Sequence, residues 1–136
     1  MSVGDVMFRD ELGPIQAFSW GRFVVSGEEH AKVGGAKTGK GKDIFLVGRK
    51  VRKWKEREGH TLTRAMVQRA LGRGVEVLVI GNGVYGRIDV APEVIAHLEA
   101  GGISEVRVLE TPDACKLYNE LHRAGRKVAL LAHGTC

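Results

Sequence analysis

The segment Val75-Glu76-Val77-Leu78-Val79-Ile80-Gly81-Asn82-Gly83 joins an almost unbroken apolar run to a glycine turn. Short runs rich in β-branched residues are typical of strands that are buried on both faces, as in parallel sheets. The run predicts a central strand over residues 75–80. The glycines after it predict a turn at the carboxyl end of that strand, where open α/β sheets usually bind ligands.

Helix and strand patterns alternate around this strand. Residues 61–73 have apolar side chains at helical spacing, and Pro92 suits the first turn of a second helix. Residues 105–109 alternate as a strand, Thr111 is expected to cap a third helix, and residues 128–132 form the last strand. This order predicts an α/β fold with a βαβαβ C-terminal half, parallel neighbouring strands and right-handed crossovers.

The first half of the chain has a different pattern, with short strand candidates separated by glycines. These candidates are residues 15–20, 22–25, 43–47 and 50–54. They predict a β-rich meander packed against the central sheet. Residues 33–42 are rich in glycine and lysine, which predicts a mobile loop. We expect residues 1–14 to be an N-terminal extension and residues 15–136 to be a single domain.

Composition excludes several classes of protein. The 136 residues suffice for one core, and 43% hydrophobic with 27% charged residues is usual for a globular chain. No apolar run approaches the roughly 18 residues of a membrane helix, and the start does not resemble a secretory signal. Two cysteines give no disulfide framework, so we expect a cytoplasmic protein. The scarcity of amide side chains is compatible with a thermophilic source.

Positive charge is concentrated in residues 32–57, which hold ten Lys or Arg and two Asp or Glu; from residue 58 onward the nine basic and nine acidic residues cancel. An anionic partner would therefore meet the first half of the chain. On a strand, Lys50, Arg52 and Trp54 share a face, where Trp54 could stack on a nucleic-acid base. The interpretation we favour is a solvated edge strand whose lysines prevent pairing with another chain.

Residues 81–86 spell the G-x-G-x-x-G pattern of dinucleotide-binding proteins. In that motif the last glycine opens a helix whose N-terminal amides hold the pyrophosphate. Here Arg87 and three further residues intervene, and Pro92 delays the helix, so we reject a dinucleotide site. Two interpretations remain open: a turn that needs positive φ, or a loop whose open N–H groups and Arg87 hold a small anion.

Three further patterns lack a necessary part. Residues 34–41 resemble a phosphate-binding Walker loop, but a glycine replaces its final Ser or Thr. Cys115 and His122 would lie about 10 Å apart on one helix, too far for a nucleophile and its base, so Cys115 is expected to fill the core. His133 and Cys136 supply half of a zinc site, without paired histidines elsewhere. We expect neither a metal nor a cofactor.

Short motifs follow one another along residues 15–136 in a fairly specific order. They are Phe18-Ser19-Trp20-Gly21, Val51-x-x-Trp54 with His60, Val77-Leu78-Val79-Ile80-Gly81-x-Gly83, Val90-x-Pro92, Gly102-Ile103, Thr111…Tyr118-Asn119 and His133-x-Thr135-Cys136. In these motifs the chain resembles the Mth domain family, which includes the adipogenesis-associated Mth domain-containing protein and, more distantly, a mitochondrial complex I assembly factor. The basic residues 33–42 depart from the family, whose members are usually shorter and less basic there.

The resemblance implies a compact three-layer α/β domain around a mixed sheet, with a β-rich N-terminal part. It implies no activity that can be assigned to particular residues. The eukaryotic members are associated with differentiation and assembly roles. Our first hypothesis is therefore a non-enzymatic binding or assembly domain that acts through protein partners, a second copy of the chain among them.

Two alternatives remain open. One is a small-anion-binding or catalytic pocket made by the strand-end loop and the C-terminal tail. Its residues would be Gly81, Gly83, Arg87, His133, Thr135 and Cys136. This alternative requires the strands at 75–80 and 128–132 to run parallel, because only then do the loop and the tail meet at one sheet edge. The other alternative, which we favour least, is weak nucleic-acid binding through residues 32–57.

Overall fold

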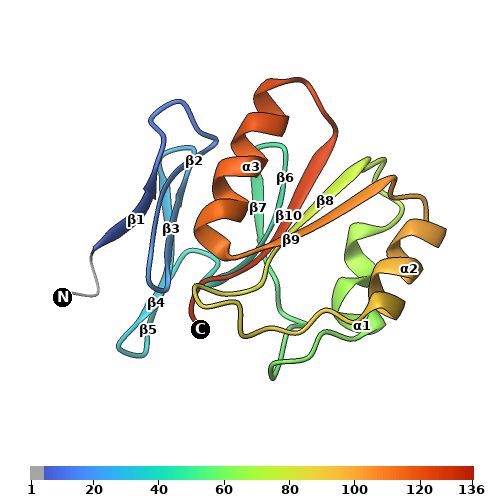
Figure 1. Cartoon of the computed structure of the whole chain (residues 1–136). Helices are drawn as coiled ribbons and strands as arrows, with labels where there is room; N and C mark the ends of the chain where they lie inside the picture. Colours follow the sequence, from blue (N-terminus) through green and yellow to red (C-terminus); the bar gives the residue numbers. More distant parts are fainter. Residues whose placement is uncertain (1–4) are drawn as a thin grey trace.

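The structure, a computed structural model, describes residues 5–136 and contains two five-stranded sheets (Figure 1). Sheet A is an antiparallel meander in the order β1-β2-β3-β4-β5. Its strands are β1 (Val6–Arg9), β2 (Ile15–Ser19), β3 (Arg22–Val25), β4 (Glu28–Val33) and β5 (Ala36–Thr38). Because each strand pairs with its neighbour in sequence, short glycine-containing turns suffice to connect them.

Sheet B is mixed and has the order β7-β6-β10-β8-β9. Its strands are β6 (Asp43–Val47), β7 (Lys50–Lys53), β8 (Val77–Gly81), β9 (Glu105–Leu109) and β10 (Val128–His133). β8 runs parallel to both β9 and β10, as predicted, whereas β6 is antiparallel to β10 and β7. The carboxyl ends of β8 and β10 therefore lie at the same sheet edge, beside the start of β6.

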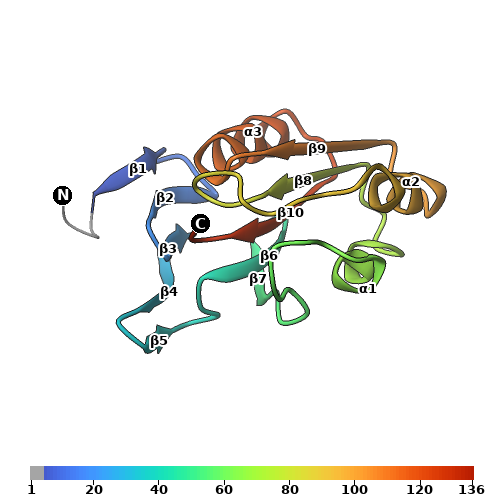
Figure 2. The ribbon, with the colours of Figure 1, turned by 60° about the horizontal axis from the view of Figure 1, so that its bottom comes forward.

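Three α-helices cover the two faces of sheet B (Figures 1 and 2). They are α1 (Arg64–Val67), which continues as a 3₁₀ turn over Gln68–Ala70, α2 (Pro92–Ala100) and α3 (Thr111–Arg123). The first two helices lie on one face, and α3 lies on the other, between the two sheets. None of the helices in the described chain is long and apolar enough to cross a membrane.

The alternation of side chains along β10 divides the core in two. Val128 and Leu130 point toward α3 and sheet A, whereas Ala129 and Leu131 point toward α1 and α2. Both sets are buried, which explains why the strand is apolar without a break. The three-layer arrangement around a mixed sheet is thus confirmed, and sheet A packs beyond α3.

The helix predicted over residues 61–73 is wrong in its extent. Only residues 64–70 are helical, and Thr61 instead bridges to Asp89. The indole N–H of Trp54 donates to the Met66 carbonyl at 2.8 Å. In a longer α-helix that carbonyl would instead accept the backbone N–H four residues further on. The third helix begins one residue early, with Thr111 as its first residue and Glu110 at the cap position.

The first half also differs from its prediction, because β6 and β7 belong to the central sheet and only β1–β5 form the separate meander. Within residues 33–42, expected as a loop, β5 pairs with β4 as a hairpin. Within residues 1–14, expected as an extension, β1 pairs with β2. Residues 1–4 of that expected extension lie outside the described residues.

Candidate functional site

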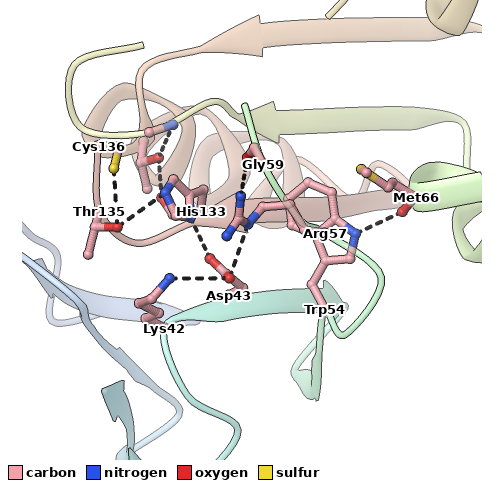
Figure 3. A network of polar contacts seen from close by, with 11 residues as sticks. Lys42, Asp43, Trp54, Arg57, Gly59, Met66, His133, Thr135 and Cys136 are labelled. Atoms are coloured by element: carbon pink, nitrogen blue, oxygen red, sulfur yellow. Dashed lines mark hydrogen bonds and ion pairs between the residues drawn. The ribbon is translucent and has the colours of Figure 1, made fainter. Parts of the chain in front are cut away.

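The candidate site forms where β6 begins and β10 ends. Asp43 and His133 are direct partners in the antiparallel pairing of these strands. Their side chains lie on the sheet face that α1 and α2 cover, as their neighbours Phe45 and Leu131 do. His133 Nδ1 lies 2.6 Å from Asp43 Oδ1 (Figure 3). Strand register alone therefore brings together a carboxylate and an imidazole that are far apart in sequence.

Two cations hold the second carboxylate oxygen of Asp43. The Nε–H of Arg57 donates to Oδ2 at 3.1 Å, and Lys42 Nζ lies 3.5 Å from the same atom (Figure 3). Arg57 is fixed in turn because it donates to the Gly59 carbonyl at 2.7 Å. Burial on its own would raise the pKa of Asp43, but the hydrogen bond from His133 and the neighbouring positive charges lower it below its usual value.

His133 is only 2% exposed, and this burial lowers its pKa below that of a free histidine. The hydrogen bond and charge of Asp43 offset part of that shift, while Arg57 and Lys42 add to it. At neutral pH the pair therefore consists of an ionised carboxylate and a neutral imidazole. Because an ionised carboxylate only accepts hydrogen bonds, the ring proton must sit on Nδ1, which leaves Nε2 as an acceptor.

The tail after β10 supplies a partner for that acceptor. Thr135 Oγ1 lies 3.1 Å from His133 Nε2 and 3.7 Å from Cys136 Sγ (Figure 3). Gly134 lets the tail pass close to the backbone of Lys42, because a Cβ at this position would collide with the Lys42 carbonyl. The site thus contains a continuous chain of polar contacts from Asp43 through His133 to Thr135 and Cys136.

The strand-end loop meets the same tail, but through backbone atoms. The N–H groups of Val84, Tyr85 and Arg87 donate to backbone oxygens of Thr135 and Cys136, at 3.0 to 3.3 Å. These three N–H groups are therefore not open, because the tail accepts their hydrogen bonds, and the interpretation in which they hold a small anion loses these donors. The side chain of Arg87 is exposed to solvent.

Two glycines of the loop lie in close contact with neighbouring elements. Gly83 has φ +105°, and a Cβ there would stand 2.7 Å from the backbone carbon of Cys136. Its N–H donates to Thr111 Oγ1 at 3.0 Å, and that hydroxyl donates to the His133 carbonyl at 2.7 Å. Gly81, at the end of β8, lies against the same threonine. The structure therefore places Gly83 directly against the tail, where only a glycine leaves room for it, whereas Gly81 packs against Thr111 and Ala132.

The proposed nucleic-acid residues do not form a stacking surface. β7 is an edge strand, as we favoured, with Lys50 exposed and Arg52 half-buried. Trp54 is 1% exposed and packs in the core beside Phe45. The alternative in which Trp54 stacks on a base, which we did not favour, is therefore wrong, because the indole is buried. Cys115 is fully buried in the core, as expected, and burial raises the pKa of its thiol.

A basic hollow of about 190 Å³ adjoins Asp43. Seven cationic side chains line it, together with Trp54 and the loop between β5 and β6. The cations are Lys32, Lys37, Lys40, Lys42, Lys53, Lys55 and Arg57. Asp43 is the single acidic residue in the lining, and its oxygens already contact Arg57, Lys42 and His133. The hollow is therefore strongly positive.

From the sequence, His133, Thr135 and Cys136 are candidates, but Asp43, which connects them to the basic segment, is not. The available signal was that Asp43 is one of two acidic residues among the ten cations of residues 32–57. Its pairing with His133 depends on strand order, which the sequence pattern did not reveal. Within residues 5–136, no three side chains of His, Cys, Asp or Glu gather as a metal-binding group would require.

The fold and this site define a small α/β domain with two features at one edge of its mixed sheet. One is the basic hollow, and the other is a polar cluster of Lys42, Asp43, Arg57, His133, Thr135 and Cys136. Residues 15–133 match the family described as "Protein of unknown function (DUF498/DUF598)". The chain belongs to this family.

Solved structures of similar fold agree with that assignment. A conserved hypothetical protein of Pyrococcus horikoshii OT3 is 22% identical with a TM-score of 0.73, over 90% of this chain and 98% of its own. The protein MT938 is 24% identical with a TM-score of 0.67, over 97% of this chain and 100% of its own. A Mth938-like domain of Bordetella pertussis is 20% identical with a TM-score of 0.61, over 88% of this chain and 84% of its own. The resemblance to the Mth domain family is thus confirmed.

Proposed function

We propose that this protein is a binding domain that takes a multiply charged anion in the basic hollow beside Asp43. The observation that carries the proposal is the lining: seven Lys or Arg side chains surround one small depression. Like charges that share a hollow repel one another, and this repulsion is relieved when an anion enters. Binding of such an anion therefore stabilises the folded state.

The arrangement of the charges favours a compact ligand. The cations come from β4, β5, β7 and the segments next to them, and they converge on a volume of about 190 Å³. A phosphate ester or pyrophosphate group concentrates several negative charges in such a volume. Arg57 has limited mobility because Gly59 and Asp43 hold it, whereas the exposed lysines are free to adjust to the ligand.

The anionic group has two possible carriers, a small phosphorylated compound or the acidic segment of a protein partner. We favour the small compound, because the charges surround a hollow and do not follow a stripe. The acidic segment of a protein partner would bind the same positive charges. Such binding would agree with the assembly roles of the eukaryotic members of the Mth domain family. A cytoplasmic location, expected from the two free cysteines, belongs to this proposal as well.

The test is a titration in buffer of low ionic strength with sodium pyrophosphate, an oligo-aspartate peptide and a single-stranded oligonucleotide. Calorimetry gives affinities, and a thermal-shift assay reports binding to the folded state. We expect the tightest binding for pyrophosphate, weakening steeply with added salt. Tighter binding of the peptide or the oligonucleotide would overturn the preference for a compact ligand. Absence of binding to all three would overturn the proposal.

Paired variants separate the hollow from general positive charge. Lys40→Gln with Lys53→Gln removes two charges from the lining, and Lys116→Gln with Lys127→Gln removes two exposed charges elsewhere. We expect pyrophosphate affinity to fall about ten-fold or more in the first double variant, which is about 1.4 kcal/mol. The second should bind almost as the wild type does. Equal losses in both would show that net charge alone attracts the anion.

A further inference from the structure

The contacts at the end of β10 have a definite proton order. Asp43 is ionised and accepts the Nδ1–H of His133, so Nε2 carries a lone pair. The hydroxyl of Thr135 lies 3.1 Å from Nε2, and because Nε2 can only accept, Thr135 is the donor in a hydrogen bond between them. The alternative acceptor for the same proton, Cys136 Sγ, lies farther away at 3.7 Å. A carboxylate, an imidazole and a hydroxyl in this order are the arrangement by which histidine activates a hydroxyl nucleophile.

The surrounding structure fixes each member of this arrangement. Strand pairing sets Asp43 opposite His133, and Arg57 holds the free oxygen of the carboxylate at 3.1 Å. Thr111 binds the His133 carbonyl at 2.7 Å. The Gly134 carbonyl accepts from the Gly21 N–H at 2.7 Å, and the Thr135 carbonyl accepts from Val84. Such fixation from several elements is what a preorganised site requires.

The three residues of this arrangement differ in their exposure to solvent. Asp43 and His133 are largely removed from water, with 13% and 2% of their side chains exposed. Thr135, in contrast, is only half-buried, so its hydroxyl lies at the border between the core and solvent. A base that is shielded from water beside a nucleophile that is reachable agrees with chemistry on an external substrate.

We propose that Thr135 is a nucleophile that accepts an acyl group from an ester or thioester, with His133 as its general base and Asp43 as the residue that positions His133. The hydroxyl oxygen attacks the carbonyl carbon of the substrate, and its proton passes to His133 Nε2. The bond from that carbon to the leaving oxygen or sulfur breaks, and the leaving group takes the proton from Nε2. A threonine ester and a free alcohol or thiol result.

Water completes the reaction at the same atoms. A water molecule gives its proton to Nε2 and attacks the carbonyl carbon of the threonine ester. The bond to Thr135 Oγ1 breaks, and the threonine oxygen recovers its proton from the imidazole. The products are a carboxylic acid and the original protein, and no oxidant or reductant is needed.

The chemical class of the substrate follows from the neighbouring charges. Lys42, Asp43 and Arg57 belong both to the basic hollow and to the polar cluster that contains Thr135. An acyl compound with an anionic group, such as a phosphorylated acyl carrier, therefore suits the combined site. This preference rests on the proposed anion binding, whereas the reactivity of Thr135 does not.

The experiment uses an uncharged fluorophosphonate probe on the full chain, so its outcome is independent of the hollow. Intact mass reports one adduct, and peptide mapping locates it. We expect labelling at Thr135 in the wild type and in Thr135→Ser, and none in Thr135→Val. Thr38→Val removes an exposed hydroxyl elsewhere and should label as the wild type does. His133→Gln should slow labelling at least ten-fold, and thermal melts confirm that each variant is folded.

Three results would overturn the proposal: no adduct on the folded wild type, an adduct on Cys136 instead of Thr135, or an unchanged labelling rate in folded His133→Gln. If His133→Gln does not fold, Asp43→Asn replaces it. That variant keeps the size of the side chain but alters which nitrogen of His133 carries the proton. A normal labelling rate in Asp43→Asn would then contradict the proposal.

Discussion

Asp43 and His133 are 90 positions apart in sequence, yet they face each other across β6 and β10 and share a contact of 2.6 Å. Asp43 lies in the basic first half of the chain and His133 in the α/β second half, and the sequence pattern predicted no contact between these two regions. Their contact places the C-terminal tail beside the cationic hollow. Titration of this pair is therefore a direct probe of the site.

Acid should destabilise the protein partly through His133. Burial lowers the pKa of His133 below the unfolded value of about 6.5. Above about pH 6.5 the neutral imidazole of His133 makes its full contribution to the free energy of unfolding. This contribution is lost as the pH falls, because the unfolded chain then takes up a proton that the folded state resists. One such proton gives a slope of up to about 1.4 kcal/mol per pH unit.

The measurement is urea unfolding at intervals between pH 5 and 7.5. His133→Gln should show a shallower fall in the free energy of unfolding than the wild type. His60→Gln, at an exposed position, serves as the control and should keep the wild-type slope. Parallel curves for the wild type and His133→Gln would contradict this account of the pair.

Gly83→Ala should destabilise the protein by preventing the tail from docking. The residue has φ +105°, and a methyl group would stand 2.7 Å from the backbone carbon of Cys136. Gly102 is the matched control, because it has φ +108° with nothing within 4 Å of the same methyl group. Both variants incur backbone strain of about 1–2 kcal/mol, but only Gly83→Ala adds the collision. Equal losses of unfolding free energy in the two variants, measured by urea titration, would show that the tail shifts away from the added methyl group at no cost.

The α/β half was predictable from sequence because its signals are local. β9 matches its predicted residues 105–109, α2 begins at Pro92, and β8 and β10 lie within one or two residues of their expected ends. Apolar runs, prolines and glycines determine these features through nearby residues alone. The alternation of strands and helices predicted parallel neighbouring strands in this half. The sequence leaves open whether the last strand runs parallel to the strand at 75–80, and the structure shows that β8 and β10 do pair parallel.

The site itself was only half predictable, because it depends on contacts between distant elements. From the sequence, His133 and Thr135 were candidates in a pocket that they would share with the loop of residues 81–87. That loop does meet the tail, as parallel strands require, yet through its backbone. The side chain of His133 turns toward β6, whose place beside β10 no local pattern revealed. Asp43 was missed for the same reason.

Asn119→Ala should cost about 2–6 kcal/mol of stability, because Asn119 connects α3 to sheet A. Its side chain accepts from the Ile15 N–H at 2.9 Å and donates to the Ile15 carbonyl at 2.7 Å. Removal of the amide leaves two buried backbone groups without partners, at about 1–3 kcal/mol for each. Glu120→Ala changes the neighbouring exposed residue and should have almost no effect in the same urea titration. A loss below about 1 kcal/mol for Asn119→Ala would mean that water replaces the amide.

The two free cysteines should react with thiol reagents at very different rates. Cys115 is fully buried on α3, and burial raises the pKa of its thiol, so little thiolate forms and no reagent reaches it. Cys136 is half-buried in the tail and contacts Thr135. Native protein should therefore release one equivalent of chromophore from an aromatic disulfide reagent, and a second only when it unfolds. The Cys136→Ser variant should release none while folded, and rapid reaction of that variant would show that the packing around α3 opens under native conditions.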